Sequence, residues 1–160
     1  MAVELTCVTP TTAVPGLTVR RVSTMTELKE FSRRLTAVST PPDLQVVEFY
    51  RRVATRLLAH DAPMTCYIGC MGDRVVGTSE LTRSGGVVGL YNVATSEEYR
   101  HRGIGSAMTT VPLLEARSHG ALRAVLQTTA EGETMYERVG FQSFGMVSEF
   151  KPPQAWFRNP

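Results

Sequence analysis

The segment that most constrains the fold of this chain is a glycine loop, Arg-His-Arg-Gly-Ile-Gly-Ser-Ala at positions 100–107. It follows an apolar run, 87–94, and opens a segment with helical character, so the pattern predicts strand, loop and helix in that order. Gly103 and Gly105 allow a tight turn and a close approach of the backbone to a ligand. Free backbone N–H groups and the helix dipole at such a helix start favour an anion. The loop therefore predicts a phosphate or pyrophosphate site, to which Arg100, His101 and Arg102 add positive charge.

Two common phosphate-binding loops are excluded by the residues after the second glycine. A P-loop requires Gly-Lys-Ser/Thr, whereas Gly105 is followed by Ser106 and Ala107. A dinucleotide-binding fingerprint requires a third glycine where this chain has Met108. The loop therefore belongs to neither class.

The loop instead resembles a motif of the GCN5-related N-acetyltransferase (GNAT) superfamily. Arg100-x-x-Gly103-x-Gly105 is similar to the pyrophosphate loop of that family, Gln/Arg-x-x-Gly-x-Gly/Ala. Further along, Met-Tyr-Glu-Arg-Val-Gly-Phe at 135–141 is similar to the family segment Leu-Tyr-x-x-x-Gly-Phe. The resemblance implies an α/β (α+β) fold. Its central sheet is mixed and mostly antiparallel, split between the fourth and fifth strands and flanked by helices.

Length and residue composition predict one compact domain, because 160 residues leave no room for a second domain of ordinary size. The acetyltransferase domain is expected over 17–150. Pro10, Pro15 and Gly16 favour an N-terminal arm over 1–16 that lies outside the core. Residues 151–160 are expected to form a C-terminal tail.

Charge and hydropathy argue against several partners. The net charge is +2 with interspersed signs, so no nucleic-acid or membrane-surface partner is predicted. Neither a membrane span nor a signal peptide is evident, and a cytoplasmic location is expected. Metal-like spacing is missing from the histidines and cysteines, so no metal is predicted and the thiols are expected to be buried. A homodimer is left open. The histidines and cysteines in question are His60, His101, His119, Cys7, Cys66 and Cys70.

Periodicity and turn residues place the remaining elements. Strands are predicted at 18–22, 65–70, 75–81, 87–95 and 124–128, and helices around 28–35 and over 44–60 and 103–119. The second helix carries an apolar stripe that includes Tyr50. By resemblance the first two helices cover the acceptor pocket, although a stripe of this kind is typical of plain core.

The resemblance also implies a cofactor site for acetyl-CoA between the fourth and fifth strands. The main chain of Val93, Ala94 and Thr95 is expected to bind the pantetheine arm, although ordinary strand pairing would also explain these residues. Thr129 stands where many relatives have a cofactor-binding Asn, and its hydroxyl has a shorter reach. The pyrophosphate is expected to contact the loop residues Arg100, His101, Arg102, Gly103, Ile104, Gly105 and Ser106.

The implied reaction is direct acetyl transfer to an amine, which we expect to be a small molecule, in a ternary complex. Tyr136 matches the family position of the general acid and also contacts the cofactor, and the alternative is an aromatic residue that only packs. The amide of Val93 is the candidate oxyanion donor. Glu80 is the candidate base, acting through a water; Tyr91 or Asn92 could position one, and Glu80 could instead be a solvated strand residue. The alternative function is a non-catalytic acyl-CoA-binding or sensor module.

Overall fold

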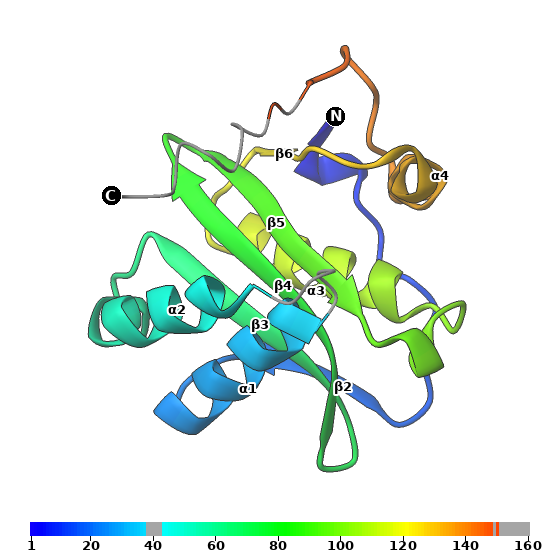
Figure 1. The fold of residues 1–160 in the computed structure, drawn as a ribbon. Coiled ribbons are helices and arrows are strands. Elements are labelled where there is room, and N and C mark those ends of the chain that lie inside the picture. Colours follow the sequence, from blue (N-terminus) through cyan, green and yellow to red (C-terminus); the bar gives the residue numbers. More distant parts are fainter. Residues whose placement is uncertain (38–42, 149, 151–160) are drawn as a thin grey trace.

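A six-stranded sheet forms the centre of the molecule, in the strand order β1-β6-β5-β4-β3-β2. The computed structural model describes residues 1–37, 43–148 and 150. All neighbouring strands are antiparallel except β5 and β6, which are parallel. The sheet is therefore mixed and mostly antiparallel, as predicted (Figure 1). The strands are β1 (Ala2–Glu4), β2 (Leu17–Arg21), β3 (Met64–Met71), β4 (Arg74–Ser84), β5 (Val87–Thr95) and β6 (Arg123–Val125).

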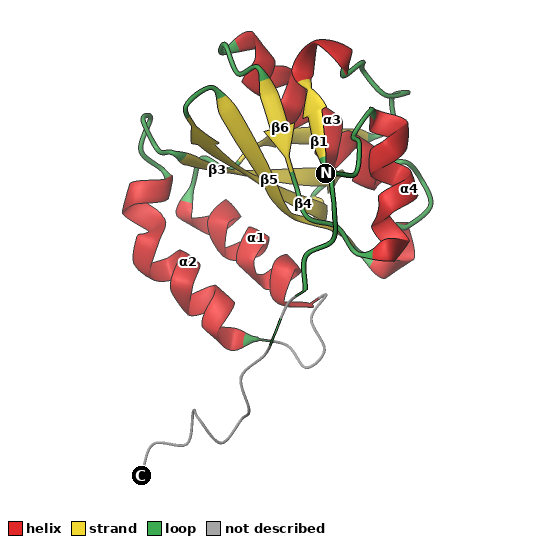
Figure 2. Cartoon of the chain, turned by 90° about the horizontal axis from the view of Figure 1, so that it is seen from above, coloured by secondary structure: helices red, strands yellow, loops and turns green. Residues whose placement is uncertain are grey.

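Helices cover both faces of the sheet (Figure 2). Helices α1 and α2 pack on one face, and α3 and α4 lie on the other. The face of α1 and α2 buries a cluster around Phe31, Tyr50 and Ile68, whereas Met108 and Leu113 of α3 belong to the larger cluster on the opposite face. The helices are α1 (Met25–Ala37), α2 (Leu44–Leu57), α3 (Ile104–Ser118) and α4 (Ala130–Val139), with short 3-10 turns η1 (Leu5–Cys7) and η2 (Glu97–Tyr99).

The parallel strands β5 and β6 pair only at one end. Val87, Val88 and Gly89 are the residues of β5 that pair with β6, which is shorter than the predicted strand 124–128. From Leu90 to Thr95, β5 has no strand beside this edge within the described part of the chain. The predicted split between these two strands is therefore present, and it leaves backbone groups free to bind a ligand.

A β-bulge lies in β5 beside this split. Glu80 pairs with Tyr91 and Thr78 pairs with Ala94, so two residues of β5, Asn92 and Val93, lie opposite the single residue between them on β4. Asn92 has a positive φ of 53°, which is uncommon for a residue other than glycine. A bulge of this kind bends the strand and redirects its side chains, and such bulges are over-represented next to active sites.

The N-terminal segment is part of the core, which corrects the expectation of an arm outside it. Ala2–Glu4 pairs antiparallel with β6. Leu5 and Val8 are each only 1% exposed, and Arg117 Nη1 donates to both of their carbonyl oxygens, at 3.1 and 2.9 Å. The strand has only three residues, too few for alternation to reveal it. The predicted tail over 151–160 lies outside the described residues.

Candidate active site

The glycine loop presents a helix start whose backbone donors are free. Gly103 is the N-cap of α3 with a φ of 81°, and its carbonyl accepts the first helical bond from Ala107 N, at 3.0 Å. No side chain caps this helix. The amides of residues 103–106 therefore lack partners within the helix and can bind an anion together.

The two positions of the loop require glycine for different reasons. Gly103 needs its positive φ, a conformation that strains any side chain. At Gly105 an added Cβ would lie 3.8 Å from Thr95 Oγ1 and 3.9 Å from Met135 Cε. The open side of Gly105 therefore faces the end of β5 and helix α4, which is the side where β5 and β6 separate.

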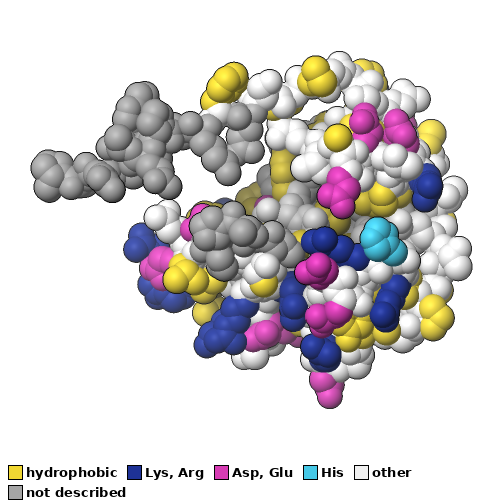
Figure 3. Space-filling view, turned by 45° about the vertical axis from the view of Figure 1, so that its right-hand side comes forward, with side chains coloured by type: hydrophobic (Ala, Val, Ile, Leu, Met, Phe, Trp, Pro, Cys, Tyr) yellow, Lys and Arg dark blue, Asp and Glu magenta, His cyan; other side chains and the backbone are white. Residues whose placement is uncertain are grey.

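The basic residues of the loop lie at the surface. Arg100, His101 and Arg102 are exposed, and the Arg102 guanidinium lies 5.3 Å from the ring centroid of Tyr99. On the face shown in Figure 3, a histidine lies among Lys and Arg side chains with Asp and Glu between them, so this surface is not uniformly basic. Ile104 is buried in the core, which leaves only its amide available to a ligand.

The other predicted cofactor residues line the same region. Val93, Ala94 and Thr95 are half-buried on the part of β5 that pairs with β4 but has no neighbour on its β6 side. Thr129 is the exposed N-cap of α4 and its side chain makes no cap hydrogen bond. Its hydroxyl is therefore available for a hydrogen bond to a ligand.

Tyr136 combines a packed ring with a protonated hydroxyl. It is 8% exposed, and its ring meets Phe141 edge-on at a centroid distance of 5.8 Å. Burial raises the pKa of Tyr136 to about 12. The hydroxyl makes no hydrogen bond to any described residue, so its proton is available to a ligand. Packing and proton donation are compatible at this position.

The candidate base, Glu80, is a buried carboxylate, and the alternative of a solvated strand residue is wrong. Glu80 is 5% exposed, and its Oε2 accepts from the Tyr50 hydroxyl at 2.5 Å and from Asn92 Nδ2 at 3.3 Å. Asn92 Nδ2 also donates to the Tyr50 oxygen, at 3.0 Å. Burial, and next the bond to Glu80, raise the pKa of Tyr50 far above its ordinary value, so its hydroxyl remains a donor.

A pocket opens over this carboxylate. Its volume is about 460 Å³, within the range of small-molecule sites. Asn92 lines the pocket and also belongs to the β5 bulge, whose other residue, Val93, lies on the part of β5 that has no β6 neighbour. Tyr91 is 44% exposed and its ring lies over Gly89. The lining residues are Leu35, Asp43, Gln45, Val46, Phe49, Tyr50, Met64, Glu80 and Asn92.

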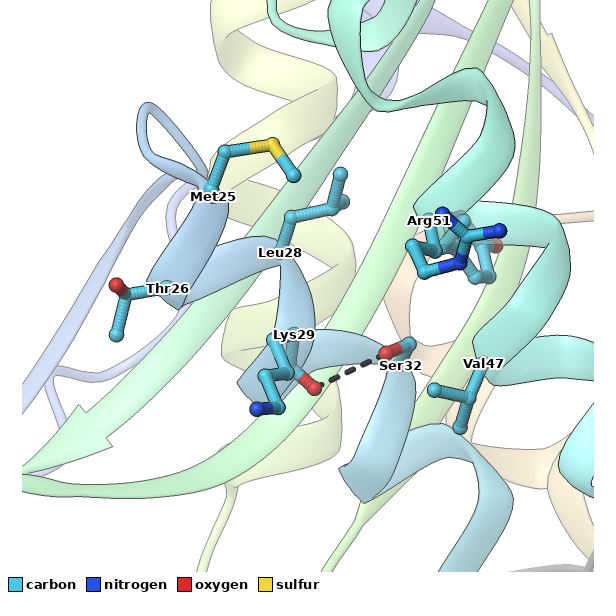
Figure 4. Close-up of a pocket in the computed structure, with 8 residues that line it drawn as sticks. Met25, Thr26, Leu28, Lys29, Ser32, Val47 and Arg51 are labelled. Atoms are coloured by element: carbon cyan, nitrogen blue, oxygen red, sulfur yellow. Dashed lines mark hydrogen bonds between the residues drawn. The ribbon is translucent and has the colours of Figure 1, made fainter.

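A second pocket, of about 300 Å³, lies between α1 and α2 (Figure 4). Its wall is mostly apolar, with Lys29 and Arg51 as its charged residues. Arg51 is already paired with Glu48, at 2.7 and 2.8 Å. Tyr50 lines both pockets, and its hydroxyl donates to Glu80. Glu80 lines only the first pocket, so the pocket between α1 and α2 has no carboxylate among the described residues of its wall.

Tyr50 is a candidate site residue that the sequence analysis did not single out. The apolar stripe of the second helix was interpreted as lid or core, and its ring does pack, with centroids 5.1 Å from Phe31 and 5.2 Å from Phe49. The available signal was chemical, because a buried Tyr hydroxyl and a buried Glu each need a hydrogen-bond partner.

The sequence matches the model of a known protein family, the acetyltransferase (GNAT) domain, over residues 62–143. The match covers just over half of the chain and includes β4, β5, the glycine loop and α4. The chain belongs to the GNAT acetyltransferase family. No curated protein gives a significant match.

Solved GNAT structures share this fold. A GCN5-related N-acetyltransferase from Kribbella flavida aligns with a TM-score of 0.69 and 21% identity, over 88% of this chain and 52% of that one. This chain thus spans about half the length of that protein. An acetyltransferase from Trypanosoma brucei aligns with a TM-score of 0.66 and 23% identity, over 85% and 99%. A predicted acetyltransferase from Clostridium acetobutylicum, solved with acetyl-CoA, aligns at 0.61 and 14%, over 84% and 96%. At these identities the likeness concerns the fold.

The described residues contain neither a membrane-spanning helix nor a metal-binding cluster. None of the helices found there combines the length and apolar character that a membrane crossing requires. Over 1–37, 43–148 and 150, no three His, Cys, Asp or Glu side chains come together as a metal site would require.

Proposed function

We propose that this GNAT protein transfers the acetyl group of acetyl-CoA to an amine by direct attack in a ternary complex. One observation carries the proposal: two sites meet at the β5 bulge. On one side lie the unpaired edge of β5 and the free amides at the start of α3. On the other lies the pocket over Glu80, which Asn92 of the bulge also lines. A donor and an acceptor bound in these sites would meet beside Val93.

The described residues fit an extended ligand that ends in a pyrophosphate. The free amides of Gly103 to Ser106 suit the pyrophosphate, because a helix start binds anions through aligned N–H groups and the dipole. The vacant Cβ position of Gly105 opens toward the split, where Val93, Ala94 and Thr95 offer backbone groups to the pantetheine amides. Arg100, His101, Arg102 and Thr129 lie around this path as further candidate contacts.

Acetyl-CoA, when bound, supplies an activated thioester carbon. The residues of the chain then have three tasks. Glu80 takes a proton from the ammonium group of the acceptor, directly or through a water, so that the nitrogen can form its bond to carbon. The amide of Val93 donates to the carbonyl oxygen as negative charge develops on it. Tyr136 gives its proton to the sulfur as the carbon–sulfur bond breaks. The nitrogen loses its remaining extra proton, which returns through solvent to the Tyr136 oxygen, and the products are an amide and coenzyme A.

Two features favour an enzyme over an acyl-CoA sensor. A sensor needs the loop and the split, but it does not need a buried carboxylate with two donors on the acceptor side. It also does not need a protonated tyrosine near the cofactor site. The buried carboxylate is costly unless a function retains it.

Coenzyme A and acetyl-CoA are each expected to raise the melting temperature of the purified protein. A ligand that binds only the native state stabilises it by about 2.7 kcal/mol at a concentration of 100 times its dissociation constant. The measurement is a thermal melt at increasing ligand concentration, with AMP as the control that lacks the pantetheine arm. Equal stabilisation by AMP would contradict binding along β5. If neither acetyl-CoA nor coenzyme A shifted the melting temperature, both the enzyme and the acyl-CoA sensor would be refuted.

Gly105→Val is expected to abolish coenzyme A binding with little loss of stability. The nearest atoms to its added Cβ are 3.8 and 3.9 Å away, which is ordinary contact, but the branched side chain would fill the approach to the amides. Gly103→Val should instead lower the melting temperature, since its φ of 81° strains any side chain. Calorimetric titration of both folded variants checks this. Normal affinity in Gly105→Val would refute the loop assignment.

Tyr50→Phe is expected to lower kcat/KM about ten- to a hundredfold, the range for losing one hydrogen bond to a charged group. The aromatic contacts with Phe31 and Phe49 are kept. The matched control is Tyr67→Phe, because Tyr67 is buried on the other face and its hydroxyl has no hydrogen-bond partner within the described residues. Equal rates in the two variants would show that the Tyr50 hydroxyl does not support Glu80.

A further inference from the structure

The buried carboxylate of Glu80 lacks a cationic partner. Its hydrogen-bond donors, Tyr50 and Asn92, are both neutral, and it forms no ion pair with any described residue. Its second oxygen, Oε1, accepts no hydrogen bond from the described residues. A buried carboxylate is expensive unless a positive charge compensates it. The pocket that Glu80 lines is therefore suited to a cation from outside the protein.

The mouth of the same pocket carries a second acid. Asp43 caps α2 by accepting from Gln45 N at 2.9 Å, and it too forms no ion pair with a described residue. The pocket lining contains no Lys, Arg or His. The electrostatics of the pocket thus favour an ammonium group and disfavour a carboxylate or phosphate on the same acceptor.

Apolar side chains make up most of the remaining wall. Leu35, Val46, Phe49 and Met64 supply most of it, and Phe49 is 49% exposed beside Tyr50. An aromatic ring or short alkyl chain of the acceptor would bury its surface against these side chains. The faces of Phe49 and Tyr50 also attract a cation. A polyhydroxylated acceptor would instead lose its hydration here, with only Gln45 and Asn92 as neutral polar amides in the lining.

We propose that the acceptor is a small primary amine attached to an apolar, ring-sized group, with no acidic substituent. Its ammonium group lies against Glu80 and its apolar group lies against Phe49 and Val46. Asp43 at the mouth rejects acceptors that carry a carboxylate. This proposal rests on the proposed function and names the substrate class of that site.

The test measures amine binding by calorimetry to the full chain saturated with coenzyme A, so that it does not depend on turnover. The probes are 2-phenylethylamine, phenylalanine, which adds a carboxylate to it, and ethanolamine, which lacks the ring. We expect 2-phenylethylamine to bind at least about tenfold more tightly than either, because an unpaired or repelled group in a buried site costs at least that much. Equal affinity for phenylalanine or ethanolamine would overturn the proposal.

Two variants with matched controls test which residues distinguish 2-phenylethylamine from phenylalanine and ethanolamine. Asp43→Asn keeps the helix cap and removes the charge, so it should narrow the preference for 2-phenylethylamine over phenylalanine about tenfold, whereas Glu30→Gln, an exposed residue of α1, should not. Phe49→Ala should weaken 2-phenylethylamine but not ethanolamine, and Leu44→Ala, which is 74% exposed on the same helix, should change neither. Unchanged affinities in both pocket variants would overturn the proposal.

The coenzyme A measurement also distinguishes failure of this proposal from failure of the proposed function. If coenzyme A itself fails to bind, the proposed function falls and the acceptor class falls with it. If coenzyme A binds and the three probes do not differ, only the acceptor class is wrong.

Discussion

Tyr136→Phe is expected to lower turnover about 10²- to 10⁴-fold, the usual contribution of a positioned general acid. Affinity for coenzyme A should change little, because proton donation to the departing sulfur matters in the transition state and much less in the ground state. The melting temperature should stay near that of the unmodified protein. The ring keeps its edge-on contact with Phe141, and the hydroxyl that is lost makes no hydrogen bond to the described residues.

Tyr67→Phe is the control for this variant, because it removes a hydroxyl from a second buried tyrosine far from the glycine loop in sequence. Burial raises the pKa of Tyr136 to about 12, so the proton stays on the oxygen at neutral pH. Between neutral pH and about pH 10, the ordinary pKa of tyrosine, turnover should therefore show no loss from ionisation of Tyr136. If the Tyr136→Phe variant retained most of its activity, water or another donor would have to protonate the departing thiolate.

The glycine loop and its flanking strand and helix were predictable because they depend on local backbone chemistry. Gly103 and Gly105 specify a loop conformation that few other residues allow, and the loop lies between a strand and a helix that periodicity identifies. The parallel crossover from β5 through α3 to β6 follows from the length of the connection, since parallel strands need a long one. Local rules therefore sufficed to predict the loop and the parallel pairing, whereas the split between the two strands was implied by the resemblance to the GNAT family.

The acceptor side was only partly predictable because it depends on tertiary contacts. Glu80 stands in a polar part of β4, after Thr78 and Ser79, and looks like a solvated position until α2 covers it. Tyr50 and Glu80 are thirty positions apart, and only packing of α2 on the sheet brings their oxygens to 2.5 Å. The N-terminal strand posed the same difficulty, because Ala2–Glu4 gains its pairing from β6, at the far end of the chain.

The two halves of the site follow different design constraints. The loop binds its ligand through main-chain groups, so many side chains around it can vary without loss of the anion site. The pocket over Glu80 is built from side chains of α1, α2, β3, β4 and β5, so each substitution there alters shape or charge. We therefore expect cofactor choice to be fixed by the fold and acceptor choice to be fixed by these side chains.

Glu80→Gln is expected to lower turnover about 10²-fold or more at neutral pH, because an amide cannot take the proton that the ammonium group of the acceptor must lose. Alkyl amines have pKa values near that of lysine, about 10.4, so at neutral pH nearly all of the acceptor is protonated. The variant should recover as the pH approaches that value, because the free amine then needs no base. The measurement is the ratio of kcat/KM between the two proteins from pH 7 to pH 10.

Glu30→Gln removes an exposed carboxylate of α1 and should leave the same ratio near one at every pH. The shape of the profile distinguishes two roles for Glu80. A ratio that is large at pH 7 and small at pH 10 is the signature of a base, because only the need for proton removal changes with pH over that range. A ratio that stays large throughout would make Glu80 a positioning residue that orients the amine, and a ratio of one throughout would transfer proton removal to a water held by backbone groups.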